Sequence, residues 1–282
     1  MKLSVFYDHI LKAHEQTGKS VPEILKLCHS CGIDGVEVDY DAFEKNGDEI
    51  CAMLADAQMR ISCFCRFFEF QNNGDLSGAK KMLETAADLN VGRVLIIPGF
   101  LNAPDAAELS ACSGLYETTA RFMDGHPGVQ NMKGALVALT EYAAARGVAV
   151  TLEDFDGFAQ PFARMNQLLW FMKNVPGLRF TLDMGNFAFS DENVIQAAAL
   201  LKDYIVHVHC KDRAVNPAVC GTFCKGLGAS PVGSGYIPIR ELIAVLRDIS
   251  YDGYLVIEHF GAPDQLSFIR QSAAFLRSCM ES

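Results

Sequence analysis

Four short apolar runs in the second half of the chain each end in a residue that can bind a metal ion. The four residues are Glu153, Asp183, His209 and Glu258. Carboxylate oxygens together with an imidazole nitrogen suit a hard or borderline divalent cation. The runs are rich in β-branched and aromatic residues, which is typical of buried parallel strands. Because parallel strands share one carboxyl edge, we expect these side chains to converge there and to hold a metal ion.

A carboxylate at the end of a strand also has a common structural explanation. A single Glu or Asp at such a position is about as often a helix N-cap or an ion-paired structural group as a metal ligand. Four such residues together would place uncompensated negative charge in a partly buried site, which is costly unless a cation neutralises it. The complete set therefore favours metal binding more strongly than any one of its members.

The periodicity of apolar residues predicts eight strand-then-helix units. The strands are predicted at residues 2–6, 35–39, 60–65, 93–98, 148–153, 179–183, 205–211 and 254–258. The helical patterns lie at residues 21–30, 41–57, 76–89, 131–145, 161–174, 193–201, 239–249 and 263–278. Eight such units close a (β/α)8 TIM barrel of the α/β class, and these barrels commonly run about 250 residues as one domain. We therefore expect a single domain over residues 1–282.

Two connections between these units are long enough to cover the expected site. The segments 99–129 and 212–235 contain several glycines and prolines, so both are predicted to be loops over the carboxyl face of the barrel. We expect them to supply a lid and contacts to a substrate. Within the second segment, Gly233-Ser234-Gly235 could be mistaken for a phosphate cradle, but its context favours a tight loop before the next helix.

The composition indicates a compact globular protein with an acidic charge balance. Half of the residues are hydrophobic and 21% are charged, which suffices for a sizeable core. The net charge of −10 opposes binding to nucleic acid, because phosphate contacts depend on Lys and Arg. No apolar run approaches the roughly 20 residues that span a bilayer, and the N-terminus shows no signal-peptide pattern. We expect a cytoplasmic protein that binds neither nucleic acid nor membrane.

Ten cysteines are scattered through the predicted helices and strands. In a long chain of cytosolic character, reduced thiols are favoured over disulfides. The close pairs are Cys28 with Cys31, Cys63 with Cys65, and Cys220 with Cys224. Their spacing is too loose or too isolated for a zinc ribbon, and buried free cysteines usually act as small hydrophobic residues.

Five motifs, taken in order, resemble those of a known family. They are Thr-Leu-Glu153, Leu-Asp183-Met-Gly-Asn186, His-Val-His209-Cys-Lys211-Asp212, Val-Gly233-Ser-Gly235 and Gly253-Tyr-Leu-Val-Ile-Glu258. Over nearly its full length the chain resembles the sugar phosphate isomerase/epimerase family of xylose isomerase-like TIM barrels. The family includes ketose 3-epimerases, hydroxypyruvate isomerase and inosose dehydratase.

The resemblance implies a metal-dependent enzyme. In ketose 3-epimerases of this family one divalent ion, usually manganese, cobalt or magnesium, is held at the positions of Glu153, Asp183, His209 and Glu258, and zinc also suits this donor set. The two glutamates at these positions also serve there as the acid/base pair. A proton alpha to a carbonyl is lost at neutral pH only if a base is in place and the forming enediolate is stabilised. The metal would meet the second need by binding the carbonyl and a neighbouring hydroxyl.

The expected activity is isomerisation or epimerisation of a small sugar, sugar phosphate or related polyhydroxy carbonyl compound. Return of the proton to the opposite face gives epimerisation, and return to the adjacent carbon gives aldose–ketose isomerisation. A lyase like inosose dehydratase, which would expel a β-hydroxyl from the same enolate, is the alternative. A non-catalytic sugar-binding protein is a more distant alternative, against which the retention of both glutamates argues. A nuclease like endonuclease IV would need additional histidines at the strand ends.

Six further residues are predicted to contact the substrate. They are Asn186, Lys211, Arg213, Glu37, His9 and Arg66. Asn186 stands where relatives often carry a histidine that contacts a substrate hydroxyl, so its hydrogen bonding differs from theirs. Lys211 and Arg213 follow the strand of His209 and could orient hydroxyls or a phosphate. For all six a purely structural role is the alternative.

Two features remain open from the sequence. His207 points to the same side as His209 by the alternation of a strand, and it either supports that ligand or is simply packed. The resemblance implies a homo-oligomer, because relatives are often dimers or tetramers, and both states fit the sequence.

Overall fold

The computed structural model describes residues 1–72, 74–219 and 222–281, with no account of the side chains of 216–219 and 222–224. These residues form two compact units. The first unit consists of Met1–Ser62 and His207–Ser282, and the second consists of Cys63–Val206. Of the cysteines that lie close together in the sequence, Cys220 and Cys224 are outside the residues whose side chains are described. Free thiols are found at the other eight cysteines.

The first unit is built on four parallel strands. The strand β1 (Lys2–Phe6) pairs with β2 (Ile33–Asp39) on one side and with β9 (Tyr254–Glu258) on the other. The strand β9 pairs in turn with β7 (Ile205–Val219). Because all four run in the same direction, their carboxyl ends meet at one edge of the sheet.

Five helices belong to the first unit. They are α1 (Tyr7–Thr17), α2 (Val21–Ser30), α3 (Tyr40–Asp56), α10 (Ile239–Asp248) and α11 (Gln265–Glu281). The pattern of α10 shows why these segments become helices. Its buried residues recur at helical spacing and form one apolar stripe. They are Ile239, Leu242, Ile243 and Leu246.

The helix α1 was not among the predicted helices. Its buried residues include His9 as well as Tyr7, Ile10 and Ala13, so the apolar stripe is short. The remaining positions are mostly charged or polar, which hides the helical period of this segment. The structure therefore places His9 on a helix that directly follows β1.

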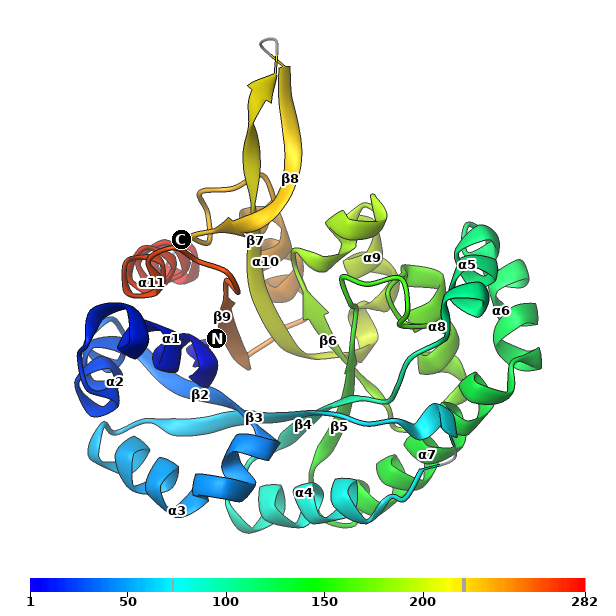
Figure 1. The fold of residues 1–282 in the computed structure, drawn as a ribbon, viewed down its shortest axis with the longest axis horizontal. Helices are drawn as coiled ribbons and strands as arrows, with labels where there is room; N and C mark the ends of the chain where they lie inside the picture. Colours follow the sequence, from blue (N-terminus) through cyan, green and yellow to red (C-terminus); the bar gives the residue numbers. More distant parts are fainter. Residues whose placement is uncertain (73, 220–221, 282) are drawn as a thin grey trace. The chain divides into compact units, whose positions relative to one another are not determined.

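The predicted loop over residues 212–235 is wrong for most of its length. The strand β7 continues to Val219 and pairs antiparallel with β8 (Thr222–Ser230), and this hairpin runs beyond the other strands of its unit (Figure 1). Glycine and proline signalled a loop, yet both strands of a two-stranded ribbon are edge strands, and edge strands tolerate these residues. The β-branched Val215 and Thr222 are typical of strands.

The second unit is built on the remaining four parallel strands. The strand β3 (Arg60–Phe67), which belongs to this unit from Cys63 onward, pairs with β4 (Arg93–Ile97). The strand β4 pairs with β5 (Ala149–Glu153), and β5 pairs with β6 (Arg179–Asp183). All eight predicted strands are thus present, and their starts or ends differ from the predicted ones by at most a few residues except at the end of β7.

Six α-helices belong to the second unit. They are α4 (Ser77–Asp88), α5 (Ala103–Cys112), α6 (Tyr116–Gly125), α7 (Pro127–Ala144), α8 (Met165–Asn174) and α9 (Val194–Leu201). Single 3-10 turns also occur here, at η1 (Phe70–Asn72), η2 (Asn186–Ser190) and η3 (Lys202–Tyr204). No helix within the described part of the chain has the length and apolar character needed to cross a membrane.

The predicted loop over residues 99–129 is also wrong, because it contains α5 and α6. Its prolines start helices rather than break them. Pro104 lies in the first turn of α5, whose N-cap Asn102 accepts a hydrogen bond from the Asp105 N–H at 3.0 Å. Pro127 is the first residue of α7. A proline in the first helical turn removes an N–H that has no partner within the helix, so it costs little there.

Candidate active site

Two of the four predicted ligands lie at the ends of neighbouring strands in the second unit. Glu153 is the last residue of β5 and Asp183 is the last residue of β6, and both are buried. The strand register sets Glu153 opposite Thr181, two residues before Asp183. Since side chains alternate along a strand, Glu153 and Asp183 face the same side of the sheet. This half of the predicted ligand set is therefore oriented as expected.

Backbone amides hold the Asp183 carboxylate in place. Its Oδ1 accepts hydrogen bonds from the N–H groups of Gly185 and Asn186 at 2.7 and 2.8 Å. Its own N–H donates to Oδ1 of Asp154 at 2.9 Å. The turn after β6 thus binds one oxygen of the carboxylate and fixes the direction of the other.

The side chain of Asn186 takes part in the same turn. Its Nδ2 donates to the backbone oxygen of Asp154 at 2.8 Å, and the residue is almost fully buried. This bond joins the turn after β6 to the end of β5. Asn186 therefore has a structural bond in addition to the substrate contact predicted for it, which stays a prediction.

The other two predicted ligands lie on neighbouring strands of the first unit. His209 comes from β7 and Glu258 ends β9, and both are buried. The Nδ1 atom of His209 lies 3.2 Å from Oε2 of Glu258. The second carboxylate oxygen, Oε1, forms an ion pair with Nζ of Lys211 at 2.5 Å. Glu258 thus faces an imidazole with one oxygen and an ammonium group with the other.

The surroundings of Glu258 keep it ionised. Burial acts to raise the pKa of this carboxyl, but the positive charge of Lys211 and the hydrogen bond and charge of His209 outweigh it. The net effect holds the pKa of Glu258 well below its ordinary value. A carboxylate that is ionised at neutral pH can bind a cation or accept a proton.

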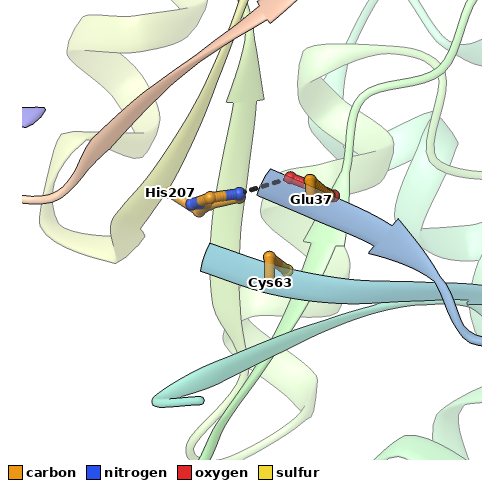
Figure 2. Close-up of side chains that lie close together, drawn as sticks. All are labelled: Glu37, Cys63 and His207. Carbon is orange, nitrogen blue, oxygen red and sulfur yellow. Dashed lines mark hydrogen bonds and ion pairs between the residues drawn. The ribbon is translucent and has the colours of Figure 1, made fainter. Parts of the chain in front are cut away.

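Glu37 lies beside the two histidines of β7 and is fully buried. Its Oε2 accepts a hydrogen bond from Nε2 of His207 at 2.7 Å (Figure 2). The same oxygen lies 3.1 Å from Nε2 of His209. Burial acts to raise the pKa of Glu37, but the two histidines outweigh it and lower the pKa to about 2. These contacts favour a role for Glu37 in holding His209 in position. The contact with a substrate predicted for Glu37 stays a prediction. His207 is held by Glu37 rather than merely packed.

His9 supports the segment that follows Glu258. Its Nε2 accepts a hydrogen bond from the N–H of His259 at 2.9 Å, and the two rings stack with centroids 4.8 Å apart. The exposed ring of Phe260 lies edge-on to His9 at 4.6 Å. Burial, followed by the neighbouring His259, lowers the pKa of His9 well below its ordinary value, so the ring is neutral. In the structure His9 thus holds the backbone of His259 in place. The substrate contact predicted for His9 stays a prediction.

Arg213 and Asp212 close the base of the β7–β8 hairpin. The Nη1 of Arg213 donates to the backbone oxygen of Leu227 at 2.8 Å. Asp212 accepts backbone N–H bonds at 2.8 to 3.1 Å. The donors are Arg213, Gly233, Gly235 and Ile237. The glycine loop that resembles a phosphate cradle therefore binds the chain's own carboxylate, in agreement with the tight loop predicted there.

Arg66, on β3 in the second unit, lies over the ring of Phe68 with its guanidinium carbon 5.5 Å from the ring centroid. The residue is only partly buried. This contact leaves the predicted substrate contact of Arg66 as a prediction.

Sequence reasoning missed the roles of Asp154, Asp212 and His259. Each directly follows a residue that was singled out, in the pairs Glu153-Asp154, Lys211-Asp212 and Glu258-His259. A second polar residue at the end of a buried strand is a signal for a group that anchors the turn, because a buried polar group needs hydrogen-bond partners. That signal was present in all three pairs.

The donor set fits a divalent cation. Glu153, Asp183, His209 and Glu258 are all buried, and each offers an atom that could bind a metal ion. Three carboxylates and one imidazole match the preferences of magnesium, manganese, cobalt or zinc. Within the first unit, the close approach of His209 Nδ1 to a carboxylate oxygen is an arrangement that a shared cation satisfies.

Parallel strands followed by helices, with buried acidic residues at strand ends and a buried histidine on β7, are typical of the TIM-barrel class. The family description "xylose isomerase-like TIM barrel" matches residues 25–279 of the chain. The chain belongs to this family, and its fold is the predicted (β/α)8 barrel.

Solved structures of similar fold include both epimerases and a dehydratase. The D-psicose 3-epimerase of Clostridium cellulolyticum H10 is 16% identical, with a TM-score of 0.68 over 100% of this chain and 99% of that one. A probable 3-DHS dehydratase of petrobactin synthesis from Bacillus anthracis is 17% identical, with a TM-score of 0.70 over 98% and 99%. A xylose isomerase-like barrel from Mycobacterium smegmatis, in complex with magnesium, is 16% identical, with a TM-score of 0.67 over 92% and 87%. At these identities the likeness shows the fold alone.

Proposed function

We propose that the protein is a divalent-metal-dependent isomerase or epimerase of a small sugar, sugar phosphate or related polyhydroxy carbonyl compound. The observation that carries the proposal is the set of four buried donors on the strands of a xylose isomerase-like barrel. Buried carboxylates without a cation are costly, so a set of three with a histidine has a functional reason. Similar folds that carry epimerase names add support.

Glu153, Asp183, His209 and Glu258 would hold the ion. When bound, the ion supplies a positive charge that polarises a carbonyl group and stabilises the enolate formed beside it. Manganese, cobalt and magnesium are the proposed ions, and zinc suits the same donors. The magnesium in the Mycobacterium smegmatis structure is a precedent from the same fold.

Glu258 is the proposed base. It is ionised and buried, so its carboxylate can accept the proton alpha to the substrate carbonyl in surroundings that exclude water. Lys211 lies against its Oε1 and maintains the ionised state before the substrate arrives. Glu153 is the proposed partner acid, which returns a proton to the opposite face or to the adjacent carbon.

The remaining contacts select the substrate. Lys211, Arg213, Asn186 and Arg66 are proposed to bind hydroxyl groups of the substrate. Both Lys211 and Arg213 have bonds inside the first unit, to Glu258 and to Leu227, so each is held in a defined position. A held side chain orients a substrate better than a solvated one, because less conformational entropy is lost on binding.

A dehydratase is the second candidate. It rests on the same enolate and the same donors, and a probable dehydratase is among the similar folds. The two candidates differ in the fate of the enolate, because an epimerase returns the proton whereas a dehydratase expels a β-hydroxyl.

Proton NMR in deuterated water tests the proposal. The protein, loaded in turn with Mg²⁺, Mn²⁺, Co²⁺ and Zn²⁺, is incubated with ketoses, ketose phosphates, hydroxypyruvate and inososes, and the ion is removed before spectra are recorded. Deuterium that enters a carbon alpha to a carbonyl, with loss of exchange on chelation, is the expected result. Loss of water from the substrate identifies the dehydratase. Binding without exchange for any ion would contradict the enzyme and support a sugar-binding protein.

A further inference from the structure

Glu37 joins two histidines through a single oxygen atom. Oε2 lies 2.7 Å from Nε2 of His207 (Figure 2) and 3.1 Å from Nε2 of His209. All three side chains are at most 1% exposed, so water does not compete for these contacts. Glu37 lies on β2, where the register sets it opposite Phe6 of β1. The carboxylate is thus fixed by its own strand and by both imidazoles.

The contact with Glu37 selects one tautomer of His209. A carboxylate only accepts hydrogen bonds, so an imidazole nitrogen bound to it carries the proton. A neutral imidazole with the proton on Nε2 has a lone pair on Nδ1. Glu37 therefore makes Nδ1 the atom through which His209 can bind a metal ion.

The other side of the His209 ring also faces a carboxylate. Nδ1 of His209 lies 3.2 Å from Oε2 of Glu258, the second predicted ligand of this unit. Without a metal ion this contact is favourable only if Nδ1 also carries a proton, and a bound ion would replace that proton. Glu258 already has the ammonium group of Lys211 against its other oxygen, so the proton on the Glu37 side, at Nε2, is the one that stays when the ring becomes neutral. The ring of Phe6 packs edge-on against His209 with centroids 5.0 Å apart, which limits rotation of the imidazole.

We propose that Glu37 is a positioning residue that fixes His209 as the Nε2–H tautomer and directs its Nδ1 toward the metal ion. The metal part of this inference rests on the proposed function. In this proposal Glu37 acts through His209, because its hydrogen bonds are to the two histidines. Carboxylates that bind the second nitrogen of a ligating histidine orient the ring and raise its basicity, and their loss typically weakens metal binding by about 10–100-fold.

The tautomer is measured directly in metal-free protein labelled with ¹⁵N-histidine. The ring nitrogens of His209 are identified by the signals that disappear in His209→Gln. Spectra are recorded as the pH is raised, and in the wild type we expect Nδ1 to lose its proton while Nε2 stays protonated in the neutral ring. In Glu37→Gln, which keeps the shape but loses the charge, we expect a mixture of both tautomers. A wild-type His209 with its single proton on Nδ1 would overturn the inference.

Binding of Co²⁺, followed by its visible absorption, gives the second measurement. Glu37→Gln is expected to bind Co²⁺ about 10–100-fold more weakly than the wild type. The matched control is Glu192→Gln, which alters a carboxylate that accepts the Met165 N–H at 2.8 Å in the second unit. It is expected to leave both the tautomer and the Co²⁺ affinity unchanged.

The two measurements separate the inference from the proposed function. Unchanged tautomer and unchanged Co²⁺ affinity in Glu37→Gln would overturn the inference and leave the metal site standing. A wild type that binds no Co²⁺ but has the Nε2–H tautomer, lost in Glu37→Gln, would overturn the metal site and support the role of Glu37. If Glu37→Gln does not fold, Glu37→Asp, which retains the charge on a shorter side chain, is measured in the same way.

Discussion

The carboxylates at the ends of β6 and β9 are held in two different ways. Asp183 is bound by backbone N–H groups of the turn that follows its strand. Glu258 is bound by charged or ionisable side chains, Lys211 and His209. Backbone amides do not titrate and barely move, so Asp183 keeps its direction whatever the protonation of its neighbours. Glu258 depends on its neighbours for both position and charge.

This difference suits the two roles proposed for these groups. A metal ligand needs a fixed direction, which the turn after β6 supplies to Asp183. A base must gain and lose a proton during turnover, and its pKa must respond to charge in the site. The side chains around Glu258 make that response large, whereas a second set of backbone donors would make it small.

The largest effect is expected when the charge of Glu258 is removed. Glu258→Gln keeps the size of the side chain but cannot accept a proton, so turnover should fall by about 10²–10⁴-fold or more. Deuterium exchange into the substrate is the measurement, and far-UV circular dichroism verifies the fold. Near wild-type exchange in this variant would remove Glu258 as the base.

A smaller but still large effect is expected when His209 is removed. His209→Ala deletes a proposed ligand and leaves two buried carboxylates, Glu37 and Glu258, without their shared imidazole. The affinity for the metal ion should fall by at least the roughly 10–100-fold that is typical for loss of a supporting residue, and the metal content after dialysis should fall with it. Metal content equal to that of the wild type would exclude His209 from the ligand set.

Removal of the Lys211 charge tests how strongly Glu258 depends on its neighbours, because it should change the pH dependence of catalysis. Lys211 holds the pKa of Glu258 down, so Lys211→Met should raise that pKa. The acid limb of the profile of kcat/KM against pH should then move to higher pH, since more of the base is protonated under acidic conditions. Lys225→Met, at an exposed lysine near the ring of Tyr236, is the control and should leave the limb in place.

The stability of the folded protein in acid should also depend on Glu37 and Glu258, two buried carboxyl groups of the first unit. The pKa values of Glu37 and Glu258 lie below their ordinary value of 4.5 in the folded protein. Groups with a lowered pKa stabilise the fold above the unfolded pKa, and this stabilisation is lost as pH falls through the folded pKa. The free energy of unfolding of the metal-free protein should therefore decrease between pH 4.5 and about 2, where Glu37 titrates. A constant free energy over this range, measured with urea, would contradict the ionised state of both groups.

The smallest effect is expected at the backbone-held end. Asp154→Asn retains an oxygen that can accept the N–H of Asp183, so the turn should persist. The free energy of unfolding should change by at most about 1 kcal/mol, as for one hydrogen bond. A loss of metal binding as large as that of His209→Ala would show that the β6 end also depends on side-chain charge.

Much of the fold follows from the sequence, because strands buried on both faces leave an unmistakable apolar run. Residues 2–6, 179–183 and 254–258 are strands with the predicted bounds. The predictions for the two long connections were wrong for a common reason. Outside the barrel strands, glycine and proline do not reliably predict a loop, because Pro104 starts a helix and the glycines of β8 lie in a two-stranded ribbon.

The site could be predicted only in part. Strand ends and alternation place Glu153 and Asp183 on one face, because this follows from the backbone alone. The bonds of Glu37 to His207 and His209 depend on side-chain directions and on contact between residues distant in sequence. A single sequence contains no record of that contact, so the place of Glu37 beside the two histidines could not be predicted, and the substrate contact expected for Glu37 stays a prediction.

The hairpin of β7 and β8 has a consequence for how such barrels diversify. Asp212 gathers N–H groups from both sides of the hairpin base, including Gly233 and Gly235. This clamp closes the ends of the insertion independently of what lies beyond it. Residues past Arg213 can therefore change in length and sequence without disturbing the strand that positions His209. We expect that another insertion can replace the hairpin, because the Asp212 carboxylate at its base holds the backbone on both sides.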